Sequence, residues 1–197
     1  MSSYKTIATA VEGLYKEKGS KFYAFLHPVA TEDQAKELLR EYKKKYFDAR
    51  HHCYALILGP DMAYQKYSDD GEPAHTAGTP ILNRLRSAML TDVVCIVVRF
   101  FGGTKLGVPG LIDAYKSATE AAIAQAQILE KEVMEEVNLS SDYMRVNEVM
   151  RVLKSFNALL INQEYLDTQI HFKVGIPLGQ KEDFIHIVLK NHNINLL

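Results

Sequence analysis

Hydrophobic positions along the chain repeat with two different periods, and the changes of period mark the predicted elements. Alternating or continuous apolar runs predict strands at residues 4–15, 20–27, 53–58, 63–67 and 93–98. Apolar residues at helical spacing predict helices that begin at Thr31, at Thr79-Pro80 and at Pro109-Gly110. The first 131 residues are therefore expected to combine strands with helices.

Two of these helices carry start signals in their side chains. Thr31, with Gln34 three residues later, forms a capping box. Thr79 is predicted as the N-cap of the second helix, with Pro80 at its first position. The lysines at 43–45 end the first helix. They fit a nucleic-acid patch, but cations that complement a helix C-terminus are the commoner interpretation.

The last third of the chain has a different element order. The pattern predicts a strand, a helix, two strands, a helix and a short final strand, at residues 133–139, 142–155, 159–165, 168–174, 180–190 and the tail. This β-α-β-β-α-β order is the ferredoxin-like split unit. Gly175 and Pro177 are expected to break its fourth element. The charged segment 130–136 predicts a boundary between domains 1–131 and 132–197, so the fold class is α+β.

Composition narrows the class of protein. The chain has 197 residues, 47% of them hydrophobic, and a formal net charge of −1, so charge alone does not favour a nucleic-acid partner. Cys53 and Cys95 both lie in apolar strand-like runs, which is typical of buried thiols in a reducing compartment. No leader pattern and no apolar run of about 18 residues is found, so we expect a cytoplasmic protein without a membrane partner.

Two glycine-marked loops, at residues 69–78 and 99–110, hold most of the unusual residues. The helix between them would span roughly 18 Å at 1.5 Å per residue. The following strand would span roughly 23 Å at 3.3 Å per residue. Because the two lengths nearly match, the chain runs out along the helix and returns along the strand. Both loops are therefore expected at the same edge of the domain.

That edge is suited to an anion, since helix N-termini, basic side chains and close backbone approach converge there. His51 and His52 alternate across a strand start, so at most one of them faces the site. The candidate anion-binding residues are Arg50, His52, Thr76, Gly78, Arg99, Gly102, Gly103, Lys105 and Gly107. The acidic residues Asp69, Asp70 and Glu72 have two interpretations: they hold Mg²⁺, or they complement the dipole of the helix that follows.

Three motifs in this part of the chain carry a family resemblance. The runs ARHHCYA (49–55), SDDGEPAHTAGTPIL (68–82) and VVRFFGGTKLGVPGLIDAY (97–115) resemble the YigZ/IMPACT family. The resemblance implies a first domain like domain IV of elongation factor G, a unit shared with a small-subunit ribosomal protein of the S-five kind. It implies a ferredoxin-like second domain like domain V of that factor. His75 and Pro109 depart from the pattern, which has a small residue and a glycine there.

The resemblance also bears on function, because the eukaryotic relatives regulate translation under amino-acid starvation. Together with the anion-suited edge at 69–78 and 99–110, the resemblance favours a non-enzymatic, translation-associated regulator without a cofactor, which contacts RNA, the ribosome or a protein partner through that edge. The alternative is an enzyme for a small phosphorylated or nucleotide substrate, with Mg²⁺ on Asp69, Asp70 and Glu72. A third interpretation is that the motifs only maintain loop geometry. The sequence leaves the oligomeric state open.

Overall fold

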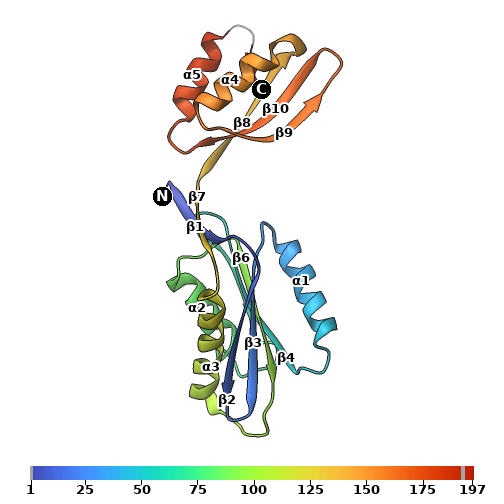
Figure 1. Ribbon diagram of the computed structural model, residues 1–197, viewed down its shortest axis with the longest axis vertical. Coiled ribbons are helices and arrows are strands. Elements are labelled where there is room, and N and C mark those ends of the chain that lie inside the picture. The colour runs from blue at the N-terminus through green and yellow to red at the C-terminus, as the bar shows by residue number, and fades with distance from the viewer. Residues whose placement is uncertain (1, 192–193) are drawn as a thin grey trace. The chain divides into compact units, whose positions relative to one another are not determined.

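The computed structural model describes residues 2–191 and 194–197 of an α+β protein. The chain divides into two compact units (Figure 1). The larger unit is Tyr4–Lys131, and the smaller is Glu132–Leu197 together with the first three residues. No helix in the part of the chain that the structure describes is long and apolar enough to cross a membrane.

The larger unit is built on a five-stranded antiparallel sheet. Its order is β2-β3-β6-β4-β5, with bounds Val11–Glu17, Ser20–Pro28, Val93–Phe100, His51–Leu58 and Tyr64–Ser68. A separate two-stranded sheet pairs β1 (Ser3–Ile7) with β7 (Ile128–Glu132). The single strand predicted at 4–15 is therefore wrong, because the chain leaves one sheet and enters another at residues 8–10.

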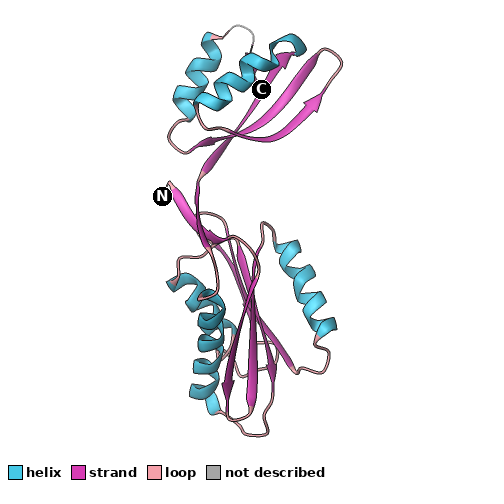
Figure 2. Cartoon of the chain, in the orientation of Figure 1, coloured by secondary structure: helices cyan, strands magenta, loops and turns pink. Residues whose placement is uncertain are grey.

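Helices cover both faces of this sheet (Figure 2). The helix α1 (Glu32–Lys45) packs on one face, while α2 (Gly78–Ser87) and α3 (Gly107–Ile123) pack on the other. Strand alternation explains the division. In β3, Phe22 and Leu26 face α2 and α3, whereas Phe25 faces α1. The same alternation decides which side chains of β4 and β6 reach the loops that lead into α2 and α3.

The helix starts agree with the sequence at α1 and differ at the other two. The Thr31 hydroxyl accepts a hydrogen bond from the Gln34 amide (3.3 Å), and the Gln34 carboxamide accepts one from the Ala30 amide (2.7 Å). The predicted N-cap role of Thr79 is wrong, because α2 begins at Gly78. Likewise α3 begins at Gly107, two residues earlier than expected.

The smaller unit has the predicted β-α-β-β-α-β order, with a short 3₁₀ turn before its first helix. Its elements are β8 (Met134–Asp142), α4 (Val146–Ser155), β9 (Leu159–Tyr165), β10 (Gln169–Pro177), α5 (Lys181–Lys190) and β11 (Ile194–Leu196). The antiparallel sheet order β11-β8-β10-β9 is that of the ferredoxin-like split unit. The predicted break at Gly175 is wrong. The strand continues to Pro177, and a Cβ at Gly175 would lie 3.1 Å from the Met134 Cβ.

Candidate functional site

The first loop folds around the carboxylate of Asp69. One oxygen accepts hydrogen bonds from the amides of Ala77 (3.0 Å) and Gly78 (2.8 Å) at the start of α2. The other oxygen accepts one from the His75 amide (2.9 Å). Asp69 therefore accepts hydrogen bonds from the amides at the N-terminus of α2, although it lies upstream of the helix in the sequence. The Thr79 hydroxyl is left free to contact the His75 ring (3.2 Å).

Asp70 is also engaged within the protein. Its carboxylate accepts a hydrogen bond from the His52 amide (2.7 Å) and forms an ion pair with Lys43 Nζ (3.0 Å). Burial acts to raise the pKa of Asp70, but the His52 amide and the Lys43 ammonium outweigh it and hold the pKa below its ordinary value. Lys43 thus connects the last turn of α1 to the loop, in addition to its place at the helix C-terminus.

Glu72 lies at the buried centre of the site, with its side chain only 4% exposed. Arg99 Nη1 donates to Glu72 Oε1 at 2.6 Å, and the Tyr115 hydroxyl donates to the same oxygen at 2.7 Å. Burial raises the pKa of Tyr115 well above its ordinary value, and the nearby Cys53 and Glu72 raise it further, so the phenol keeps its proton. The Arg99 guanidinium also lies 5.4 Å from the Phe22 ring and 5.7 Å from the Phe101 ring.

The three acids thus engage separate partners. Within residues 2–191 and 194–197, no group of three or more His, Cys, Asp or Glu side chains is arranged to hold a metal ion. The structure does not bring Asp69, Asp70 and Glu72 together as the Mg²⁺ ligands considered from the sequence. For Asp69, the geometry is that of the alternative, in which an acid complements a helix N-terminus.

The two loops share one cavity of about 470 Å³, which we call the loop cavity. It is lined by Arg50, His51, Glu72, Pro73, Arg99, Phe101, Lys105, Leu106, Gly107, Val108 and Leu111. The expectation that both loops lie at one edge of the domain is confirmed by this shared lining. Of the candidate anion-binding residues, Arg50, Arg99, Lys105 and Gly107 line the cavity.

The other candidate glycines and Thr76 lie outside the lining and serve the backbone. The buried Thr76 hydroxyl donates to the Pro73 carbonyl (2.7 Å). A Cβ at Gly78 would lie 2.8 Å from the Ser68 carbonyl oxygen, and one at Gly102 would lie 2.0 Å from the Gly19 carbonyl carbon. These two glycines are therefore required by chain crossings. Gly103, with φ of 88°, has open space around it and serves a left-handed turn.

Of the two neighbouring histidines, the structure places His51 in the cavity lining, whereas the sequence analysis selected His52. His52 is buried outside the cavity lining, and burial lowers its pKa. His51 lines the cavity. Its Nδ1 lies 2.9 Å from the Asp70 carbonyl, which can only accept, so Nδ1 carries the proton and Nε2 faces Glu72 Oε1 at 3.9 Å. The register that pairs His51 with Arg99 across β4 and β6 decides this, and alternation alone did not reveal it.

Sequence reasoning also missed the apolar wall of the loop cavity. Pro73, Leu106, Val108 and Leu111 line it, and Phe101 stands at it with 50% of its surface exposed. These residues were assigned to the loops or to the helix core. The sequence feature that could have revealed this wall is the pair of apolar residues Phe101 and Val108, each next to a glycine in a segment too short to bury them. The lining of the cavity therefore combines apolar side chains with charged ones.

The two departures from the family pattern have local explanations. His75 has φ of 65°, in the left-handed region where glycine is favoured, so a small residue is the natural occupant of that position. Pro109 is the third residue of α3. Its missing N–H falls in the first turn, where the amides have no partner within the helix, so proline is tolerated there.

The arrangement suits a ligand that combines negative charge with a flat or apolar group. Neither Arg50 nor Lys105 forms an ion pair with any described residue, whereas the charge of Arg99 is neutralised by Glu72. Leu106, at the N-cap position of α3, offers no capping side chain to the helix start that lines the cavity. Exposed helix amides and free cations are the groups that bind phosphate.

The family model described as the Impact N-terminal domain matches residues 18–123. The IMPACT family member YvyE of Bacillus subtilis (strain 168) is 34% identical over 165 residues, 84% of this chain and 76% of the relative. The family member YigZ of Escherichia coli (strain K12) is 31% identical over 186 residues, 93% and 91% of the two chains. A crystal structure of a hypothetical protein matches with a TM-score of 0.78 at 29% identity, covering 100% of this chain and 97% of its own.

Proposed function

The chain belongs to the IMPACT family, and from this premise we propose that it is a non-enzymatic, translation-associated protein that contacts RNA through the loop cavity. The translation role is what the family resemblance implies. The choice of RNA rests on one observation: a half-exposed aromatic ring and two cations without ion-pair partners among the described residues line a single cavity.

The chemistry of RNA fits these groups. Arg50 and Lys105 would contact successive phosphates, which position a strand without reading its sequence. Phe101 offers a face on which a base can stack, and base stacking on aromatic side chains tolerates any sequence. The Arg99 guanidinium packs against the Phe101 ring and would hold the ring in place for stacking.

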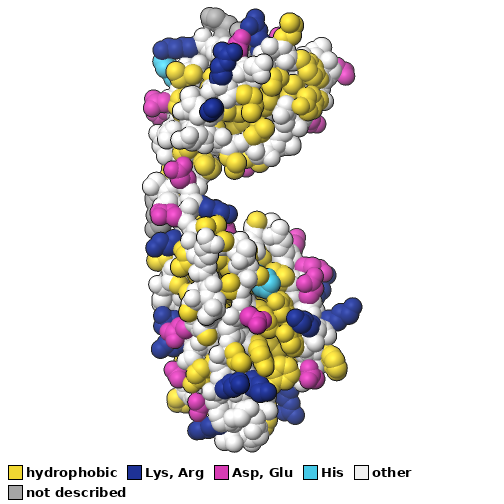
Figure 3. All heavy atoms as spheres, in the orientation of Figure 1, with side chains coloured by type: hydrophobic (Ala, Val, Ile, Leu, Met, Phe, Trp, Pro, Cys, Tyr) yellow, Lys and Arg dark blue, Asp and Glu magenta, His cyan; other side chains and the backbone are white. Residues whose placement is uncertain are grey.

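Binding of this kind would be local. The chain as a whole has a net charge of −1. On the face drawn in Figure 3, basic and acidic side chains are mixed, with no extended basic surface on either unit. A contact of only two or three phosphates is weak and sensitive to salt, which fits a protein that binds a structured ribosomal target better than one that coats single strands.

The buried groups argue against catalysis in the loop cavity. Glu72 has both Arg99 and Tyr115 as partners, so it is not a free general base. Burial raises the pKa of the Cys53 thiol, which disfavours a nucleophilic thiolate. The exposed cations Arg50 and Lys105 and the half-exposed ring of Phe101 are groups suited to binding a ligand, not to transforming one.

Cosedimentation of the full chain with ribosomes, at about 50 and 200 mM salt, tests the proposal. We expect association at low salt, a weaker association of Lys105→Gln, and a salt slope reduced by about one phosphate contact. The matched control is Lys44→Gln, which removes the same charge from an exposed site on α1. The RNA proposal fails if the folded wild-type protein does not associate at low salt, or if the two variants behave alike.

A further inference from the structure

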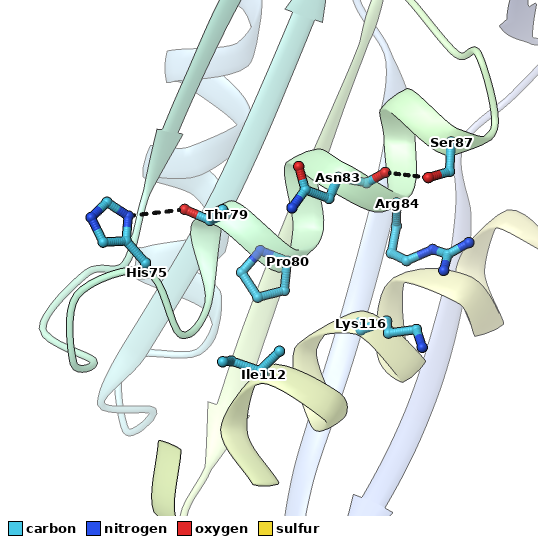
Figure 4. A pocket seen from close by; sticks show the side chains of 8 residues that line it. All are labelled: His75, Thr79, Pro80, Asn83, Arg84, Ser87, Ile112 and Lys116. Atoms are coloured by element: carbon cyan, nitrogen blue, oxygen red, sulfur yellow. Dashed lines mark hydrogen bonds between the residues drawn. The ribbon is translucent and has the colours of Figure 1, made fainter. Parts of the chain in front are cut away.

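A second cavity, of about 320 Å³, lies between α2 and α3 and shares no lining residue with the loop cavity (Figure 4). Most of its lining comes from one side of α2, and the remainder comes from α3 and from His75 in the first loop. We call it the helix cavity. Its volume is near the lower end of the range of small-molecule sites, about 300–1,000 Å³.

Two cations from opposite helices meet at the helix cavity. Arg84 of α2 and Lys116 of α3 both line it, and Figure 4 shows their side chains in the space between the two helices. Arg84 Nη1 pairs with Glu120 Oε1 at 2.9 Å, while Lys116 forms no ion pair with any described residue. Two cations against one carboxylate leave a local excess of one positive charge.

Arg84 also holds an unused donor. Its Nε is buried and has no hydrogen-bond partner among the described residues. A buried N–H without an acceptor is costly, and such groups in native proteins are commonly satisfied by water, an ion or a ligand. One guanidinium nitrogen, Nη1, therefore pairs with Glu120, whereas the Nε–H has no acceptor among the described residues.

Some of the other lining groups already form hydrogen bonds within the protein, and others can still bind a ligand. The Ser87 hydroxyl donates to the Asn83 carbonyl (2.8 Å), so it is satisfied within α2. The Asn83 carboxamide forms no hydrogen bond with a described residue and can donate to a ligand. Pro80 and Ile112 add an apolar wall, with Ile112 38% exposed. The cavity thus places donors and cations beside an apolar surface.

We propose that the helix cavity binds a small organic phosphate monoester, with the phosphoryl group on Arg84 and Lys116 and the organic body against Pro80 and Ile112. Guanidinium and ammonium groups bind phosphoryl oxygens through charge-assisted hydrogen bonds. A local excess of one charge suits a single phosphoryl group better than a polyphosphate. The two linings share no residue, so a substitution can be directed at either cavity alone.

Titration of the isotope-labelled full chain by NMR tests the proposal, with ribose 5-phosphate, adenosine monophosphate and inorganic phosphate as separate probes. We expect saturable amide shifts in α2 and around residues 112–116. The organic phosphates should bind more tightly than inorganic phosphate, because they also contact the apolar wall. Lys116→Gln should weaken binding about tenfold or more, since it removes a charge-assisted hydrogen bond.

The controls separate this proposal from the proposed function. Lys44→Gln on α1 removes an equal charge at a remote exposed site, and Lys105→Gln alters only the loop cavity. Both variants should keep the wild-type affinity for the organic phosphates, and Lys116→Gln should keep wild-type association with ribosomes. Arg84→Gln provides a second variant of the cavity itself. Unsaturable shifts, shifts centred on residues 99–108, or equal losses in Lys116→Gln and Lys44→Gln would each overturn the assignment.

Discussion

The two glycine-marked loops look alike in sequence but handle their polar groups in opposite ways. In the loop at 69–78, every carboxylate is committed to the protein: Asp69 to helix amides, Asp70 to His52 and Lys43, and Glu72 to Arg99 and Tyr115. In the loop at 99–110, Lys105 forms no ion pair with any residue that the structure describes, and Phe101 is half exposed.

This contrast assigns different tasks to the two segments. Groups whose hydrogen bonds are complete contribute to stability and have little left to offer a ligand. Groups left open contribute little to stability and remain available for binding. Substitutions of the acids in the first loop should therefore change folding, while those of Lys105 and Phe101 in the second should change binding.

Glu72→Ala should cause the largest loss of stability. It leaves the buried Arg99 guanidinium without its carboxylate and removes the acceptor of the Tyr115 hydroxyl. Breaking a buried ion pair from one side costs about 3–5 kcal/mol. The free energy of unfolding from urea denaturation measures it, with Glu37→Ala at an exposed pair on α1 as the control. A loss no larger than that of the control would contradict the structural role of the first loop.

Gly102→Ala should come next, at the tight point of the second loop. The added Cβ would lie 2.0 Å from the Gly19 carbonyl carbon and 2.1 Å from the Ser20 amide nitrogen. Overpacking of this kind costs about 1–3 kcal/mol, and a backbone contact places it at the upper end. Gly103→Ala meets no neighbour and carries only the cost of its positive φ, about 1 kcal/mol. Equal melting temperatures for the two variants would show that the crossing at Gly102 can relax.

Asp69→Ala should destabilise α2 by about 1–2 kcal/mol, the usual worth of a helix cap. It removes the acceptor of three backbone amides, those of His75, Ala77 and Gly78. Hydrogen exchange should become faster at these three amides than at the amides of the five-stranded sheet. Asp69→Asn, which keeps one acceptor oxygen, should fall between the alanine variant and the wild type.

Asp70→Asn should give the smallest effect and should make it depend on pH. The folded-state pKa of Asp70 is held below its ordinary value. Its contribution is therefore present above the unfolded pKa, about 4, and is lost as pH falls through the folded value. The difference in unfolding free energy between wild type and variant should stay within about 1 kcal/mol at pH 7, because Asp70 is partly exposed. The difference should disappear in acid, because Asp70 is then protonated in the wild type. A difference that does not narrow as the pH is lowered through the acid range would rule out the Lys43 pair as its source.

Local patterns predicted most of the elements, and contacts between distant segments account for the errors. The capping box at Thr31 is confirmed because its partners lie within a few residues. The cap of α2 was assigned to Thr79 because nothing local shows that Asp69, several residues upstream, folds back onto the helix start. The choice of His52 over His51 failed for a related reason, since strand register decides it.

The same limit applies to the candidate site. Matching a helix length with a strand length placed both loops at one edge, because that argument needs only the rise per residue. It could not say which side chains face the cavity. Arg50, Arg99 and Lys105 line it as expected, whereas Gly78 and Gly102 mark chain crossings that only the assembled structure reveals.

The sheet order β2-β3-β6-β4-β5 has a consequence for biosynthesis. The central strand β6 is the last of the five to be made, so β3 and β4 wait on the nascent chain without the partner that lies between them. At about 5–20 residues per second, roughly 2–8 s pass between completion of β4 and completion of β6. During that interval the two hairpins present unpaired strand edges, which favour aggregation or contact with chaperones. Slow codons between residues 59 and 92 would lengthen this exposure, and fast ones would shorten it.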